Sequence, residues 1–217
     1  MLEKKRKLED AIKSIELYLK NLDSIREEVV KMSRDVIRLS GWSITEAHKG
    51  NINNALNYLD ECERKSNELM KLAISVPELT YSGLLYNAIS EYVEAKIFLN
   101  IITNKEIPIY KEINVPPIPY LQGLGDVVGE LRRYALESVR KGDFNSAWES
   151  LEIMESIYLE LRGLDYPDAI LPGVRHKADV ARNLVDETKA LLVDLQSREN
   201  LKNVISNLME RKKDERR

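Results

Sequence analysis

Apolar residues recur at intervals of three and four along nearly the whole chain, which is the spacing of one face of an α-helix. The first run has these members: Leu8, Ile12, Ile15, Leu19, Leu22, Ile25, Val29, Met32 and Val36. Charged residues separate these positions, so the run predicts one long amphipathic helix. Gly50 and Asn51 interrupt the pattern and are expected to end that helix.

Five more helices are expected after this first one. They are predicted over residues 51–73, 78–103 and 120–141, then from a cap at Asn145 or Ser146 to residue 161, and over 174–208. The intervening stretches 104–119 and 163–173 are proline- or glycine-containing connectors. No segment alternates like a strand, so the fold class is all-α: an elongated multi-helix bundle forming a single domain over 1–217. Residues 208–217 are expected to fray as a charged tail.

The composition allows a real core under a charged surface, with 43% hydrophobic and 32% charged residues. Cys62 is the single cysteine, which excludes an internal disulfide and fits a reducing compartment. The charged N-terminus has no apolar core of a signal peptide, and no run approaches the roughly 18 apolar residues of a membrane span. We expect a soluble cytoplasmic protein with no membrane partner. Long bundles often bury one face against another subunit, so a homo-oligomer is also expected.

The net charge of −3 argues mildly against a nucleic-acid partner, because affinity for phosphates comes from clustered Lys and Arg. The 33 basic residues can still gather on one surface. Arg34 and Arg38 lie one turn apart in the first predicted helix, and Arg175 and Lys177 open the last one. These four are candidate nucleic-acid-binding residues, and ordinary solvated charge is the alternative.

The third predicted helix carries two carboxylates on a face that its periodicity otherwise assigns to burial. Glu91 and Glu94 share a narrow arc with Asn87 and Phe98. Burying an unpaired carboxylate is costly, so a cation is implied, either Arg or Lys or a metal ion. The alternatives are a buried salt bridge, or a face that lines a water-filled interior of an oligomer.

The fourth predicted helix places Asp126 and Glu130 one turn apart on one face. Arg133, Glu137 and Arg140 continue the same stripe, so the spacing by itself favours a solvated, salt-bridged face. Three glycines lie in this helix: Gly123, Gly125 and Gly129. Since glycine costs a helix about 1 kcal/mol relative to alanine, they indicate close approach of another backbone or a ligand beside Asp126.

Two carboxylates from each of two helices would suit a pair of Mg²⁺ or Mn²⁺ ions, which prefer oxygen ligands. Two such ions can activate water and stabilise the leaving oxygen in phosphodiester hydrolysis. The two histidines, His48 and His176, have no partners at zinc-ligand spacing, and no phosphate-binding loop is present. No side chain is indicated as a general base, so the metal would have to activate the nucleophile.

Several phrases resemble the translin family, in family order and over nearly the whole chain. They are the tract from Pro119 to Arg133 (PYLQGLGDVVGELRR), the turn SVRKGD ending at Asp143, the phrase EYVEA starting at Glu91, and the last helix from Arg175 to Arg198. The chain is similar to an archaeal-type member of that family. It is shorter than the eukaryotic members, and its linker between the two acidic helices is compact.

The resemblance implies a seven-helix subunit and a hollow octamer that encloses single-stranded nucleic acid or a short RNA duplex. One subunit type of the family chiefly binds RNA or DNA, whereas the other carries an endoribonuclease site. The carboxylates of that site fall on Glu91, Glu94, Asp126 and Glu130, all of them acidic in this chain. The implied function is a Mg²⁺- or Mn²⁺-dependent endoribonuclease that holds the metal on these four catalytic residues.

Two rival hypotheses stay open at this stage. A non-catalytic translin-like module would bind single-stranded RNA or DNA in a salt-sensitive way without cleaving it. A scaffold bundle with a protein partner would have no affinity for nucleic acid.

Overall fold

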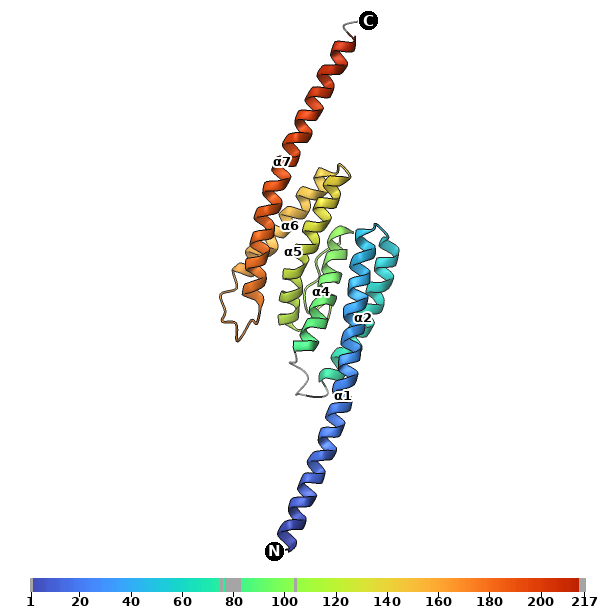
Figure 1. Cartoon of the computed structure of the whole chain (residues 1–217), viewed down its shortest axis with the longest axis vertical. Helices are drawn as coiled ribbons and strands as arrows, with labels where there is room; N and C mark the ends of the chain where they lie inside the picture. The colour runs from blue at the N-terminus through green and yellow to red at the C-terminus, as the bar shows by residue number, and fades with distance from the viewer. Residues whose placement is uncertain (1, 75, 77–82, 104, 215–217) are drawn as a thin grey trace. The chain divides into compact units, whose positions relative to one another are not determined.

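The structure is a computed structural model that describes residues 2–74, 76, 83–103 and 105–214. These residues form six helices, shown in Figure 1: α1 (Leu2–His48), α2 (Ile52–Ile74), α4 (Gly83–Ile102), α5 (Pro117–Arg140), α6 (Phe144–Arg162) and α7 (Val174–Asp214). No strand occurs among the described residues, so the all-α prediction is confirmed. The first five predicted residues of the third helix, 78–82, lie outside the described part of the chain. None of the described helices is long and apolar enough to cross a membrane.

The chain divides into two compact units, Met1–Gly123 and Leu124–Arg217, and the boundary falls inside α5. In the first unit, α1 packs along both α2 and α4, and α2 also contacts α4. In the second unit, α6 packs against α7.

Small polar side chains fill the contact between α1 and α2. Ser33, Ser40 and Ser43 of α1 are completely buried. The Ser43 hydroxyl donates a hydrogen bond to the Ala55 carbonyl at 2.9 Å, and the Ser40 hydroxyl lies 3.2 Å from the Cys62 sulfur. Small residues let two helices approach closely, and here hydrogen bonds as well as apolar packing hold them together.

Helix α4 is the centre of the first unit's core. Ten of its residues are buried, including the large side chains of Tyr92 and Phe98. Burial on this scale is expected of a helix that is apolar nearly all round.

Two helices end in glycines with a left-handed backbone, Gly50 (φ 83°) after α1 and Gly142 (φ 82°) after α5. The amide of Gly50 donates to Ala47 and that of Asn51 to Glu46, both at 2.9 Å. This pair of bonds satisfies the last carbonyls of the helix and requires a residue that tolerates positive φ. Both predicted ends are confirmed.

Three predicted boundaries were wrong. The N-cap of α6 is Asp143, whose carboxylate accepts from the Ser146 amide at 3.1 Å, and not Asn145 or Ser146. Helix α5 begins at Pro117 rather than at residue 120, since a proline in the first helical turn has no hydrogen bond to lose. Helix α7 continues to Asp214 instead of fraying from 208, because Lys, Arg and Glu are good helix formers.

The linker from α4 to α5 packs against the first unit. Ile113 and Val115 are buried, and the Tyr120 hydroxyl donates to the Pro108 carbonyl at 3.0 Å. The rings of Tyr110 and Tyr120 meet edge to face at 6.2 Å. The compact linker expected from the sequence is therefore held by its own contacts.

Candidate metal and nucleic-acid site

The carboxylates on α4 are less buried than the periodicity of the sequence indicates, because Asn87 on the same arc is exposed and only Phe98 is buried. Glu91 and Glu94 are partly exposed, whereas the residues between and beside them, Tyr92, Val93 and Ala95, are buried. The one basic residue of α4, Lys96, donates from its ammonium to Glu63 of α2 at 2.7 Å. The pair therefore places two acidic groups at the edge of an apolar core.

Gly123 lets the start of α5 lie directly on α4 beside this pair. A methyl group at Gly123 would come within 2.5 Å of the Ser90 carbonyl oxygen and 2.8 Å of the Val93 side chain. Ser90 immediately precedes Glu91, so the close approach occurs next to the acidic pair. The predicted close contact of a second backbone at the glycines is confirmed at Gly123.

In the second unit, Asp126 has a cationic partner. Its carboxylate accepts a hydrogen bond from the Lys177 ammonium of α7, and each side chain is about one third exposed, at 31% and 33%. Gly125 explains this approach, because a Cβ there would lie 2.8 Å from the Cβ of Lys177. The second glycine thus admits a side chain, whereas a Cβ at Gly129 would meet nothing within 4 Å.

The rest of the acidic stripe on α5 forms local ion pairs. Glu130 lies 3.9 Å from Arg133, and Glu137 accepts a hydrogen bond from Arg140 at 2.8 Å. The hydrogen bond from Arg140 lowers the pKa of Glu137 to about 2. The alternative of a solvated, salt-bridged face therefore describes Glu137 well and Glu130 in part.

The four predicted carboxylates occupy two helices, Glu91 and Glu94 on α4 in the first unit, and Asp126 and Glu130 on α5 in the second. Within the described ranges, no group of three or more His, Cys, Asp or Glu side chains is placed so that it could hold a metal ion. The role of these residues as metal ligands and catalytic groups, and the Mg²⁺ or Mn²⁺ requirement, stay predictions.

The basic candidates of the first unit, Arg34 and Arg38, lie near an exposed aromatic side chain that the sequence analysis did not identify. Arg34 is exposed, and Arg38 donates to Asp35 at 2.7 Å. The Arg38 guanidinium also lies 5.2 Å from the centre of the half-exposed Trp42 ring. Trp42 in turn contacts Tyr58 of α2, with ring centres 5.4 Å apart. The spacing of Arg38 and Trp42 by four residues was the signal that could have identified this cation–π pair.

The basic candidates of the second unit differ in their availability. Arg175 is exposed and lies 3.4 Å from Asp165, an ion pair of two well-solvated side chains. Lys177 is engaged by Asp126. Arg175 therefore offers a more exposed positive charge than Lys177, which is paired with Asp126.

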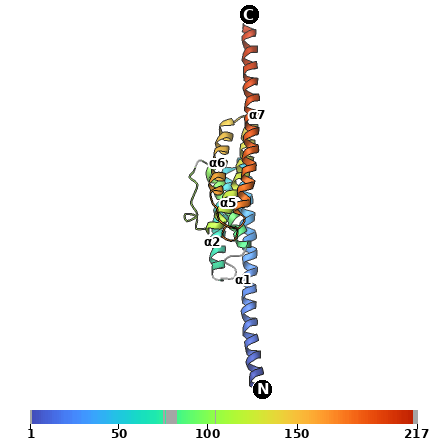
Figure 2. The ribbon, with the colours of Figure 1, turned by 90° about the vertical axis from the view of Figure 1, so that its left-hand side faces the viewer.

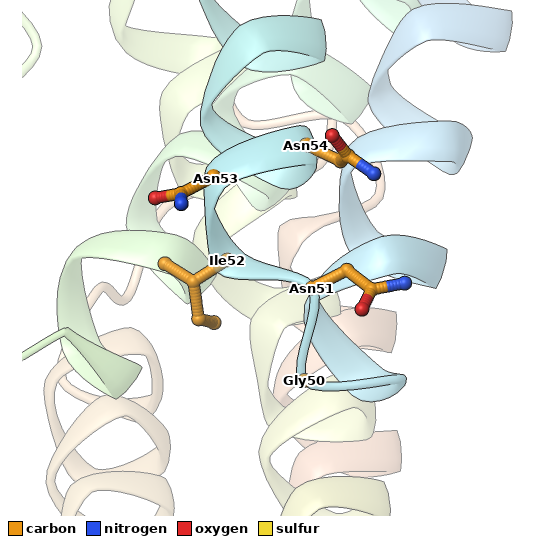
Figure 3. Close-up of a pocket in the computed structure, with 5 residues that line it drawn as sticks. All are labelled: Gly50, Asn51, Ile52, Asn53 and Asn54. Carbon is orange, nitrogen blue, oxygen red and sulfur yellow. The ribbon is translucent and has the colours of Figure 1, made fainter.

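A small pocket lies at the turn between α1 and α2, away from the predicted site residues in the sequence. It is lined by Gly50, Asn51, Ile52, Asn53 and Asn54, and the side chains of Asn53 and Asn54 point to opposite sides (Figure 3). Asn51 donates to the Glu46 carboxylate at 2.7 Å. None of the side chains that line the pocket is charged.

The described part of the chain is all-helical, and α4 and α5 each carry one of the two predicted acidic pairs. A model of the Translin family matches residues 24–199. The chain therefore belongs to the Translin family. It is 33% identical over 193 residues to the uncharacterized protein MJ0175 of Methanocaldococcus jannaschii. The matched region covers 86% of this chain and 85% of that protein.

Solved structures and a curated eukaryotic relative agree with this assignment. The structure of the AfC3PO–duplex RNA complex has 34% sequence identity and a TM-score of 0.79, covering 86% of this chain and 96% of that one. Apo-NeC3PO, at 23% identity and a TM-score of 0.77 over 85% and 96% of the two chains, supports the fold alone. Translin-associated protein X of Pongo abelii is 22% identical over 151 residues, 70% of this chain, and this chain spans about half of its length.

Proposed function

We propose that this protein is a Mg²⁺- or Mn²⁺-dependent endoribonuclease that binds RNA and single-stranded DNA inside a hollow homo-oligomer, an octamer, in the cytoplasm. The observation that carries the proposal is the half-buried pair Glu91 and Glu94 on an otherwise apolar core helix. The likeness to AfC3PO, whose structure was solved with duplex RNA, supports RNA as the ligand.

The donor set fits hard divalent cations in its chemistry. Glu91, Glu94, Asp126 and Glu130 supply only carboxylate oxygens, the ligands that Mg²⁺ and Mn²⁺ prefer. When bound, such ions would supply activation of water and stabilisation of charge on the phosphate. The four carboxylates would hold the ions.

Lys177 has a defined place in this proposal. Its ammonium neutralises Asp126 in the protein without metal, which lowers the cost of keeping a carboxylate partly buried. If Asp126 were a metal ligand, the Lys177 ammonium would no longer be needed to neutralise it and could offer a positive charge to an RNA phosphate. Arg34, Arg38 and Arg175 would add phosphate contacts from exposed positions.

The decisive experiment measures binding and cleavage of labelled single-stranded RNA in Mg²⁺, Mn²⁺ or EDTA. We expect Glu91→Gln and Asp126→Asn to abolish cleavage and to leave RNA affinity largely intact. Glu152→Gln is the matched control, because Glu152 is an exposed carboxylate on α6 outside the proposed set. Cleavage that persists in EDTA, or variants that lose binding and assembly as well, would contradict the proposal.

A second candidate function is non-catalytic binding of nucleic acid. It is favoured by the engagement of Asp126 with Lys177 and of Glu130 with Arg133, which satisfies two of the carboxylates without a metal. In that case RNA binding falls with increasing salt and no divalent ion produces cleavage.

A further inference from the structure

The N-terminal half of α1 carries an apolar stripe that its own subunit leaves uncovered. Leu8 is 62% exposed, Ile12 is 56% exposed, and Ile15 and Leu19 are each 53% exposed, while Leu22 is partly exposed. Both views show this half of α1, in blue, extending beyond the ends of α2 and α4 (Figures 1 and 2).

The spacing of this stripe is that of a coiled coil. Its members alternate in steps of four and three residues, so Leu8, Ile15 and Leu22 occupy d positions and Ile12 and Leu19 occupy a positions of a heptad. In the same register, the d positions 29 and 36 and the a position 47 are also apolar. These positions are buried by the subunit's own helices.

The exposure of the apolar positions changes sharply along this face of α1. Val29 is 2% exposed, Val36 is fully buried and Ala47 is 3% exposed. The face that α2 and α4 cover at one end of α1 therefore continues without cover at the other end. Isolated helices are only marginally stable in water, so a partner along the same seam would stabilise this half of α1.

The residues that flank the stripe select the partner and its direction. The e positions are acidic throughout: Glu9, Glu16 and Asp23. The g positions contain no acid: Lys4, Ala11, Tyr18 and Ile25. An antiparallel pair of these segments would place e against e, acid against acid, whereas a parallel pair places e against g and brings Lys4 to Glu9 of the other copy.

We propose that residues 8–22 of α1 form a parallel coiled coil with the same segment of a second copy of this chain. The segment lies outside residues 24–199, the part of the chain that matches the Translin family model. This interface depends neither on the four carboxylates of the proposed metal site nor on RNA. Its success or failure is therefore independent of the proposed nuclease function.

Disulfide crosslinking of the full chain tests the direction. The native Cys62 is completely buried and does not interfere. Under mild oxidation, Leu8→Cys and Leu22→Cys should each crosslink to themselves, because a parallel coil aligns equal d positions. Ser24→Cys, at an exposed f position on the far side, is the matched control and should stay uncrosslinked. Crosslinks that form only in a mixture of L8C and L22C, or in none of the samples, would overturn the proposal.

Amide hydrogen exchange over residues 2–22 tests the seam itself. We expect the amides of the wild type to be protected and those of I12E/I15E to lose at least tenfold in protection. Leu17→Glu is the control and should keep the protection of the wild type, because Leu17 is at an f position and 72% exposed. Equal exchange in all three proteins would show that the stripe has no partner. Substitutions in this half of α1 leave the subunit core untouched, so folding of the core does not confound either experiment.

Discussion

Replacement of Lys177 by methionine tests whether a divalent cation and the lysine compete for Asp126. Methionine keeps most of the length of the side chain that packs beside Gly125 and removes only the ammonium. If Asp126 is a ligand, the cation must displace this ammonium in the wild type. In K177M there is no ammonium to displace. We expect K177M to bind Mn²⁺ more tightly than the wild type.

The magnitude follows from the exposure of the pair. Two unit charges about 4 Å apart interact by about 4 kcal/mol at an effective dielectric constant near 20. Fully exposed pairs contribute only about 0.2–1 kcal/mol. Since both side chains are about one third exposed, we expect a value of about 1–2 kcal/mol, which corresponds to about 5- to 30-fold in the Mn²⁺ dissociation constant.

Calorimetric titration with Mn²⁺ measures the change in the Mn²⁺ dissociation constant directly. Thermal unfolding with and without Mn²⁺ measures how much the bound ion stabilises each protein. K177M should be less stable than the wild type without metal, because Asp126 loses its partner, and should gain more from added Mn²⁺. Lys189→Met is the matched control. Lys189 lies on α7, as Lys177 does, and the substitution removes its ion pair with Glu155 of α6 (2.9 Å). It should leave Mn²⁺ affinity unchanged.

Two results would refute the reasoning in different ways. If D126N abolishes Mn²⁺ binding while K177M and the wild type bind equally, Asp126 is a ligand and Lys177 does not compete for it. If none of the proteins binds Mn²⁺, the metal site itself is wrong.

The other predictions concern packing, pH and thiol chemistry. Gly123→Ala should destabilise the fold by about 1–3 kcal/mol in thermal unfolding because its Cβ meets the Ser90 carbonyl, whereas Gly129→Ala, into open space, should not destabilise it. The pKa of Glu137 is lowered to about 2, so the folded state favours its charged form. The stability difference between wild type and Glu137→Gln should be present above pH 4.5 and disappear as the pH falls towards 2. Burial raises the pKa of Cys62 to about 12, so a thiol reagent at pH 8 should react only after unfolding.

The sequence predicted the helices better than their ends. Apolar spacing located all six described helices, and Gly50 and Gly142 marked true ends because positive φ at a helix end nearly requires glycine. The start of α6 was misplaced because Asp, Asn and Ser are all good caps, and three candidates stood within four residues. The choice of Asp143 depends on side-chain geometry that spacing alone does not give.

The candidate site was predictable only as far as single helices allow. Helical periodicity placed Glu91 and Glu94 on one face of α4 but overestimated how deeply that face is buried. The partner of Asp126 did not, because Lys177 lies 51 residues further along the chain and meets it only through the packing of α5 against α7. Trp42 beside Arg38 was accessible from the four-residue spacing and was overlooked.

The hydroxyl bonds between α1 and α2 have a consequence for distances outside the core. A slip of α1 by one turn, about 5.4 Å, would separate the Ser43 hydroxyl from the Ala55 carbonyl and leave a buried group unsatisfied, at a cost of about 1–3 kcal/mol. The point at which α1 leaves the bundle is therefore fixed along its axis. Residues 2–24, at about 1.5 Å per residue, then reach about 35 Å from that point. Helix α1 thus acts as a spacer of set length, and anything attached near its first turn is held at a defined separation from the α2 and α4 core.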